Sequence, residues 1–167
     1  QFALAFAPFL VTLLDRGQRD AVTGWLERLL KYMVVVAVVS SASMVLVGPD
    51  LVPMLLGAKY RAVAANAVPL TISLLPLAVG LIGRLVGLML DRPGMTTVGA
   101  ALELTAFWAC GVLFARHAGS LGACWAALPA SVLLASYLTW RTRRELPVPL
   151  GAAGRAVALS LVFVPLA

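Results

Sequence analysis

The chain has 167 residues, of which 62% are hydrophobic and 12% are charged, and its mean hydropathy is +0.98. Since soluble domains carry about 25% charged residues, this composition excludes a water-soluble domain of ordinary surface and predicts an integral membrane protein. The formal net charge of +6 is not gathered on one stripe with aromatic residues between the bases, so it does not indicate a nucleic-acid-binding protein.

Apolar runs recur along the chain at the length that a bilayer requires. A hydrocarbon core of about 30 Å needs about 20 apolar residues in a helix. We therefore expect an all-α, antiparallel bundle in a single membrane domain, residues 1–167, with spans at about 1–14, 25–47, 64–90, 95–115, 121–140 and 150–167. The first and last runs meet the ends of the sequence, so we expect four complete and two truncated spans, as in a fragment of a larger bundle.

The segments between the spans are short and rich in residues that end helices. Gly48, Pro49 and Asp50 close the second span, and the apolar run that follows, 51–58, is too short to cross a bilayer, so we expect it at the membrane interface. An Asp-Arg-Pro-Gly sequence at 91–94 predicts a tight turn. Short connections make neighbouring helices run in opposite directions.

Lysine and arginine are distributed unequally between the two ends of such a bundle, with nine at one end and three at the other. Because positively charged loops stay in the cytoplasm, we expect the end with nine to be cytoplasmic. That end carries Arg16, Arg19, Arg28, Lys31, Arg92, Arg141, Arg143, Arg144 and Arg155, and the other carries Lys59, Arg61 and Arg116.

Arg84 and Glu103 are charged residues that lie well inside predicted spans. Arg84 precedes the turn near Pro93 by nine residues and Glu103 follows it by ten, so both lie about 14 Å from the turn at 1.5 Å per residue. We expect the two to approach each other, because a lone charge in a bilayer costs about 2.5–3.5 kcal/mol. Three interpretations stay open: a pair that fixes helix register, an Arg84 that binds an anionic substrate in a cavity, and an Arg84 that extends to the interface.

Proline and glycine mark positions where the spans depart from regular packing. Three prolines each remove a backbone hydrogen bond, and we expect kinks that are either tolerated or act as hinges for a cleft. They are Pro69, Pro76 and Pro129. Gly80, Gly83 and Gly87 have the spacing that lets two helices approach closely, and we interpret them as packing positions.

The other polar and aromatic residues give no sign of an active site. His117 lies in a short turn and is expected to be solvated, and Cys110 and Cys124 lie in apolar runs as small buried residues. With no catalytic triad, metal-ligand cluster or phosphate-binding glycine loop in the sequence, we expect neither an enzyme nor a metal or other cofactor. Four aromatic residues are expected as anchors at the membrane interfaces: Trp25, Tyr60, Tyr137 and Trp140.

Three stretches, in their order and spacing, carry a resemblance to a known family. APFL at 7–10 with DRGQR at 15–19 looks like the end of its eighth helix and the following loop. LLGAKY at 55–60 looks like the L-x-G-x-x-Y segment before its tenth helix, and AGSLGA at 118–123 like the G-x-x-G-A turn that opens its twelfth. Over nearly its whole length the chain resembles the polysaccharide-export and oligosaccharide-flippase branch of the multidrug/oligosaccharidyl-lipid/polysaccharide transporter superfamily.

The resemblance implies a fold and a function. Such proteins are similar in fold to multidrug-extrusion transporters, in which two six-helix lobes face a central cavity, and they flip undecaprenyl-linked oligosaccharides across the bacterial inner membrane by alternating access. The chain would supply most of the C-terminal lobe, with the bilayer, the lipid-linked oligosaccharide and the N-terminal lobe as its partners. Relatives often carry Asn in the helix that here holds Glu103 and Thr105, so no site for a coupling ion, H⁺ or Na⁺, carries over.

Two other functions are alternatives to the flippase. A multidrug or cation antiporter of the same fold would favour acidic or apolar residues in the cavity, whereas Arg84 suits the phosphate groups of a lipid-linked sugar. A membrane scaffold that transports nothing would need no cavity residue at all.

Overall fold

The structure is a computed structural model, and it describes residues 6–146 of the chain. Within these residues all regular structure is helical and no strand occurs, which confirms the predicted all-α class. The elements are α2 (Ala7–Asp15), α3 (Arg19–Leu46), α4 (Gly48–Leu56), the short 3₁₀ helix η1 (Ala58–Tyr60), α5 (Arg61–Ile72), α6 (Leu74–Met89), α7 (Pro93–Trp125) and α8 (Ala127–Glu145).

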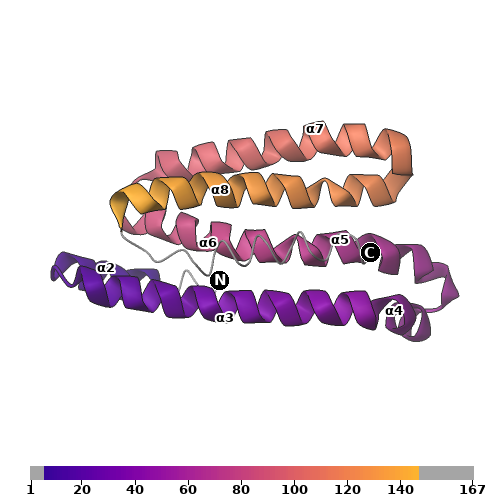
Figure 1. The fold of residues 1–167 in the computed structure, drawn as a ribbon, viewed down its shortest axis with the longest axis horizontal. Coiled ribbons are helices and arrows are strands. Elements are labelled where there is room, and N and C mark those ends of the chain that lie inside the picture. Colours follow the sequence, from indigo (N-terminus) through magenta and orange to yellow (C-terminus); the bar gives the residue numbers. More distant parts are fainter. Residues whose placement is uncertain (1–5, 147–167) are drawn as a thin grey trace.

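The long helices lie side by side and alternate in direction (Figure 1). The chain reverses after α2, through α4 and η1, between α6 and α7, and once more inside α7. There the backbone leaves helical geometry at Ala118 (φ −131°) and Gly119 (φ 59°), so the last turns of α7 run back toward α8. A positive φ favours glycine, and Gly119 stands where the predicted connection between two spans requires a sharp reversal.

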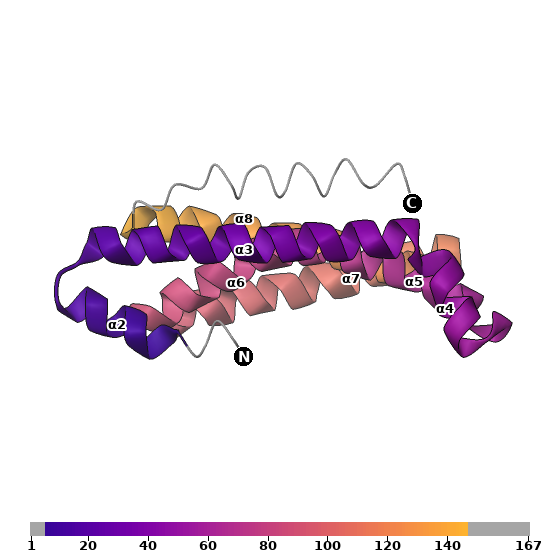
Figure 2. The same ribbon diagram turned by 90° about the horizontal axis from the view of Figure 1, so that it is seen from below.

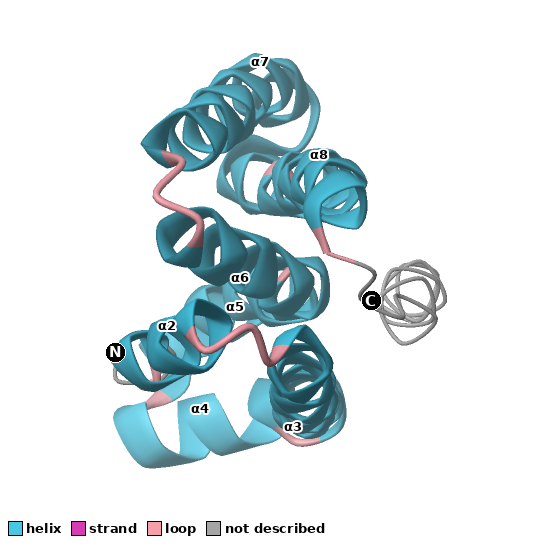
Figure 3. Ribbon diagram, turned by 90° about the vertical axis from the view of Figure 1, so that its left-hand side faces the viewer, coloured by secondary structure: helices cyan, strands magenta, loops and turns pink. Residues whose placement is uncertain are grey.

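The helices pack in a layer that is covered on both sides. In the end-on view of Figure 3, α3, α6 and α7 follow one another, α8 covers one side of the layer and α2 the other. α8 packs against both α6 and α7, and α3 packs against α5 and α6. α4 turns away from the axis of α3 and lies across one end of the bundle (Figure 2), where the sequence predicts an interfacial segment.

Within residues 6–146, two helices, α3 and α7, are long and apolar enough to cross a membrane. The bent pair of α5 and α6 would be a third candidate if the two helices together form one span. Only 17% of the apolar window of α3 and 6% of that of α7 is buried inside the bundle. Apolar surface of that extent is rare on a monomer in water, so the described part of the chain has the character of a membrane protein.

The predicted spans correspond to these elements with some shifts. The span at 25–47 belongs to α3, which begins six residues earlier at Arg19, and the span at 95–115 lies within α7. The span at 121–140 is divided at Ala126, because Pro129 has no N–H to bond the carbonyl four residues before it. Span 1–14 is described only from residue 6 onward, and span 150–167, together with Arg155, lies outside the described residues.

The span at 64–90 is bent rather than straight. α5 and α6 meet at Ser73 with a bend of 44°, three residues before Pro76, as expected when a proline cannot bond the preceding turn. Ser41 of α3 is fully buried, and its hydroxyl donates a hydrogen bond of 2.7 Å to the backbone carbonyl of Thr71 beside the bend. The bond thereby gives the buried hydroxyl of Ser41 a partner on the neighbouring helix.

The small residues of α6 serve two different neighbours. A Cβ added to Gly83 would lie 2.5 Å from Leu138 Cβ of α8, and one added to Gly80 would lie 3.0 Å from Leu134 Cδ2. Gly87 instead faces Thr96 of α7. The prediction of packing positions is confirmed, but Gly83 and Gly87 do not face one partner helix.

Candidate functional site

Arg84 of α6 and Glu103 of α7 form an ion pair in which the guanidinium Nη2 donates a hydrogen bond to Glu103 Oε2. The approach predicted from their equal distance to the turn is therefore confirmed. Arg84 does not extend to the interface as in the third interpretation. About a third of each side chain remains exposed, 33% for Arg84 and 28% for Glu103, so the pair lies at the surface of the bundle and not in its core.

Arg84 lines a groove between α3 and α6 with a volume of about 570 Å³. The walls of this α3–α6 groove are mainly aliphatic, and among the described residues that line it Arg84 is the one with a charge. Representative lining residues are Met33, Val36 and Ser40 of α3 and Leu77, Leu81 and Leu85 of α6.

Glu103 lines a second groove, with a volume of about 520 Å³, between the start of α6, α7 and α8. Leu77 contributes to this α6–α7 groove as well as to the α3–α6 groove, so the two adjoin along one face of α6. The ion pair thus places a cation in one groove and an anion in the next. The other residues of the α6–α7 groove include Ser73, Leu104, Phe107 and Ser131.

The guanidinium of Arg84 has donors that the described residues leave unused. Its Nε is buried and has no hydrogen-bond partner in this part of the chain. A buried donor without an acceptor costs about 1–3 kcal/mol, and an arginine presents its N–H groups as a planar fork that fits two oxygens at once. Nε itself is covered, so a ligand in the groove would reach the guanidinium through the exposed third of the side chain.

The three prolines lie at or near breaks in the helices that form the grooves. Pro76 follows the bend at Ser73 and Pro129 follows the break at Ala126, each in the first turn of its helix, where a missing N–H is best tolerated. Pro69 lies inside α5. Their role as hinges stays a prediction.

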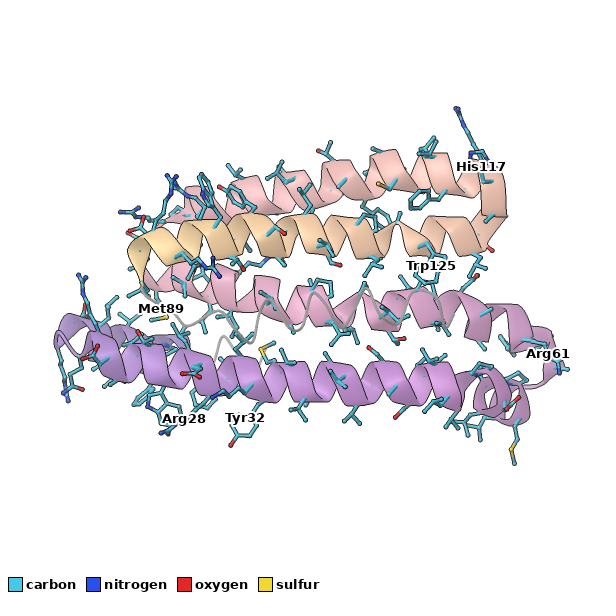
Figure 4. All side chains as sticks on the ribbon, in the orientation of Figure 1. Arg28, Tyr32, Arg61, Met89, His117 and Trp125 are labelled. Atoms are coloured by element: carbon cyan, nitrogen blue, oxygen red, sulfur yellow. The ribbon has the colours of Figure 1, made fainter. Side chains whose placement is uncertain are left out.

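Cations and aromatic rings meet at the ends of the bundle. Arg28 and Arg61 lie toward opposite ends of it (Figure 4). The Arg28 guanidinium stacks 5.5 Å from the Trp25 ring and the Lys59 ammonium lies 5.1 Å from the Tyr60 ring. From Trp25 to Leu46, where α3 ends, the helix spans about 32 Å, close to the thickness of a hydrocarbon core. The placement of these rings fits the predicted aromatic anchors.

The remaining residues singled out in the sequence lie apart from the grooves. His117 is exposed at the reversal of α7 and points away from the bundle (Figure 4). Cys110 and Cys124 are free thiols that are half-buried, which corrects the expectation of full burial. The apolar residues around each cysteine in the sequence do not enclose its thiol completely.

Two hydrogen bonds that neutral side chains make between helices of the described residues were not anticipated from the sequence. One is the Ser41 bond to the bend; the other joins Asn66 Nδ2 of α5 to Ser120 Oγ beside the reversal of α7, at 3.3 Å. A signal existed for the first, because Ser40, Ser41 and Ser43 interrupt an otherwise apolar span. Asn66 is likewise an isolated amide in an apolar run, and such groups seek partners on neighbouring helices.

Comparisons of the chain with protein-family models, with curated proteins and with solved structures find no match.

Proposed function

We propose that this chain is most of one lobe of a transporter that flips a lipid-linked oligosaccharide across the bacterial inner membrane by alternating access. The observation that carries the proposal is Arg84: a side chain that is 33% exposed and is the one charged group among the described residues lining an apolar groove of about 570 Å³. An aliphatic groove suits a polyprenyl chain, and a bidentate guanidinium suits the pyrophosphate that such carriers bear. The resemblance at 7–19, 55–60 and 118–123 supports the same function.

In this proposal the bundle crosses the membrane with alternating helices. α3, the bent pair α5–α6, the long part of α7, and the last turns of α7 with α8 form four complete spans, and the arginine-rich end lies in the cytoplasm. The apolar surface of α7, of which so little is buried, would face lipid or the N-terminal lobe. Transport would then follow from rocking of the two lobes about a site between them.

The ion pair supplies a mechanism by exchange of partners. With no substrate bound, Glu103 neutralises Arg84. A pyrophosphate entering the α3–α6 groove competes for the guanidinium, and Glu103, which faces the adjoining groove, is released to bind a cation. Binding of the substrate and binding of a cation at Glu103 are thereby coupled.

A second candidate function is a cation or multidrug antiporter of the same architecture, and one observation favours it. Glu103 lines the α6–α7 groove beside Phe107, and a carboxylate with an aromatic ring is a suitable site for an organic cation. In this case Arg84 serves only to hold the Glu103 carboxylate in position.

Binding to the purified chain in nanodiscs, measured by native mass spectrometry, separates the two candidates. We expect the chain to retain undecaprenyl pyrophosphate at least about tenfold better than undecaprenol, because a charge-assisted hydrogen bond contributes about 1.5–3 kcal/mol. Arg84→Gln should abolish this preference and Arg84→Lys should keep part of it, whereas Arg116→Gln, at the exposed reversal of α7, should change nothing. Equal retention of the two lipids, together with binding of ethidium that needs Glu103, would favour the antiporter instead.

A further inference from the structure

The outer face of α8 changes from apolar to cationic toward its C-terminal end. Leu133, Tyr137, Trp140 and Arg144 follow one another at intervals of three or four residues and so lie on one side of the helix. Leu133 is 42% and Trp140 50% exposed, and Arg144 is exposed too. The buried side of α8, with Leu134 and Leu138, faces α6 and α7, so this stripe faces away from the bundle.

Two guanidiniums converge on the Trp140 ring. The Cζ atom of Arg144 lies 4.1 Å from the ring centroid and that of Arg141 lies 5.9 Å from it, while the Tyr137 ring centroid is 6.4 Å away. Stacking on an aromatic face fixes a guanidinium and leaves its in-plane N–H groups free to donate.

Glu145, the acidic residue nearest in sequence to Arg141 and Arg144, does not neutralise these two arginines. Glu145 is engaged by Arg92 from the turn between α6 and α7. In the described part of the chain neither Arg141 nor Arg144 forms an ion pair with a carboxylate. The Trp140 cluster, defined here as Tyr137, Trp140, Arg141 and Arg144, therefore holds two uncompensated positive charges at the end of an apolar stripe.

We infer that the Trp140 cluster binds the phosphate group of an anionic phospholipid, with an acyl chain lying along Tyr137 and Leu133. The charges are complementary, because two fixed guanidiniums meet a phosphate that carries one negative charge. Along α8 the stripe runs from apolar Leu133 to cationic Arg144, which is the order of acyl chain and headgroup in a phospholipid. The corresponding site on α3 has a single guanidinium, Arg28 over Trp25, and should bind more weakly.

This inference needs the bundle to lie in a bilayer, but it does not depend on what the protein transports. The site faces away from both grooves of the Arg84–Glu103 pair. It is a site for a lipid of the surrounding membrane, on the end of the bundle where anionic headgroups attract basic segments.

Native mass spectrometry of the purified chain, released from nanodiscs containing phosphatidylglycerol and phosphatidylcholine in equal amounts, tests the inference. We expect phosphatidylglycerol to be retained in preference to phosphatidylcholine. Arg144→Gln should weaken that retention about tenfold and Arg141→Gln with Arg144→Gln about 100-fold, since each guanidinium would lose a direct, charge-assisted hydrogen bond to the phosphate. Arg19→Gln removes the same charge at the same end of the bundle without an aromatic partner, and should leave retention unchanged.

Several outcomes would overturn the site. An equal loss of retention in Arg144→Gln and Arg19→Gln would make the preference a general charge effect. Competition by soluble glycerol phosphate as strong as that by the lipid would make this a phosphate site and not a lipid site. Circular dichroism of each variant verifies folding, and Trp140→Leu gives a second test that leaves all charges in place. Arg84→Gln should not change the retention of phosphatidylglycerol. The lipid site can therefore be confirmed or refuted even if the proposed transport function is wrong.

Discussion

Replacing Glu103 with glutamine is expected to destabilise the chain by about 2–3 kcal/mol, because it leaves the Arg84 charge without its carboxylate in an apolar surrounding. Because about a third of each side chain is exposed and the pair lies at the surface of the bundle, we expect an effect at the lower end of the range for charges inside a membrane. Thermal unfolding of the purified variant in detergent, followed by circular dichroism, measures it.

The double variant Arg84→Gln with Glu103→Gln is the matched control. It removes both charges and leaves two amides that can bond to each other, so most of the stability should return. If Glu103→Gln alone unfolds at the same temperature as the unchanged chain, the pair does not stabilise the bundle, and its place between α6 and α7 would need another explanation.

Gly83→Ala is expected to separate α6 from α8 and to destabilise the chain by about 1–3 kcal/mol through overpacking. The added Cβ would stand 2.5 Å from Leu138 Cβ, an atom fixed to the backbone of α8 that no rotation of the leucine can move. The same unfolding measurement in detergent reports the loss.

Gly24→Ala is the control for the glycine substitution. Gly24 lies inside α3 with nothing within 4 Å of an added Cβ, so alanine there should be neutral or stabilise the chain by up to about 1 kcal/mol. Equal stability losses for the two variants would mean that the close contact of α6 with α8 is not required.

The Arg84–Glu103 pair could be predicted from the sequence because two simple quantities decide it. One is the number of residues from each charge to the turn at 91–94, and the other is the cost of an isolated charge in lipid. Neither depends on how the remaining helices pack. The same holds for the antiparallel order, which follows from short connections.

Other features depend on packing that a single sequence does not encode in its pattern. Pro69 and Pro76 predict a kink in the run at 64–90, but not that the chain bends by 44° at Ser73, nor that Ser41 bonds to the carbonyl beside the bend. Hydropathy locates the part of a helix that contacts lipid, but it does not locate the residue where the helix begins. α3 therefore begins at Arg19, six residues before the predicted span, whose own polar first turns carry the pair of Glu27 with Lys31.

The grooves show the same limit. Arg84 was recognisable as a candidate, but the α3–α6 groove that it lines arises from the relative positions of two helices separated by α4 and α5. Likewise, the spacing of Gly83 and Gly87 predicts close packing but not that Gly83 meets α8 and Gly87 meets α7. These relations become visible only in three dimensions.

The central claim is that the bundle crosses a membrane with its arginine-rich end in the cytoplasm, and labelling of single cysteines tests it most directly. Cys110 and Cys124 are first replaced by serine, and a cysteine is then placed at Gln18 or at His117, two exposed positions at opposite ends of the bundle whose substitution leaves every arginine in place. In bacterial spheroplasts, a maleimide that cannot cross membranes should label His117→Cys at once and Gln18→Cys only after the membrane is permeabilised. Labelling of Gln18→Cys in intact spheroplasts, alone or equally with His117→Cys, would contradict the claim.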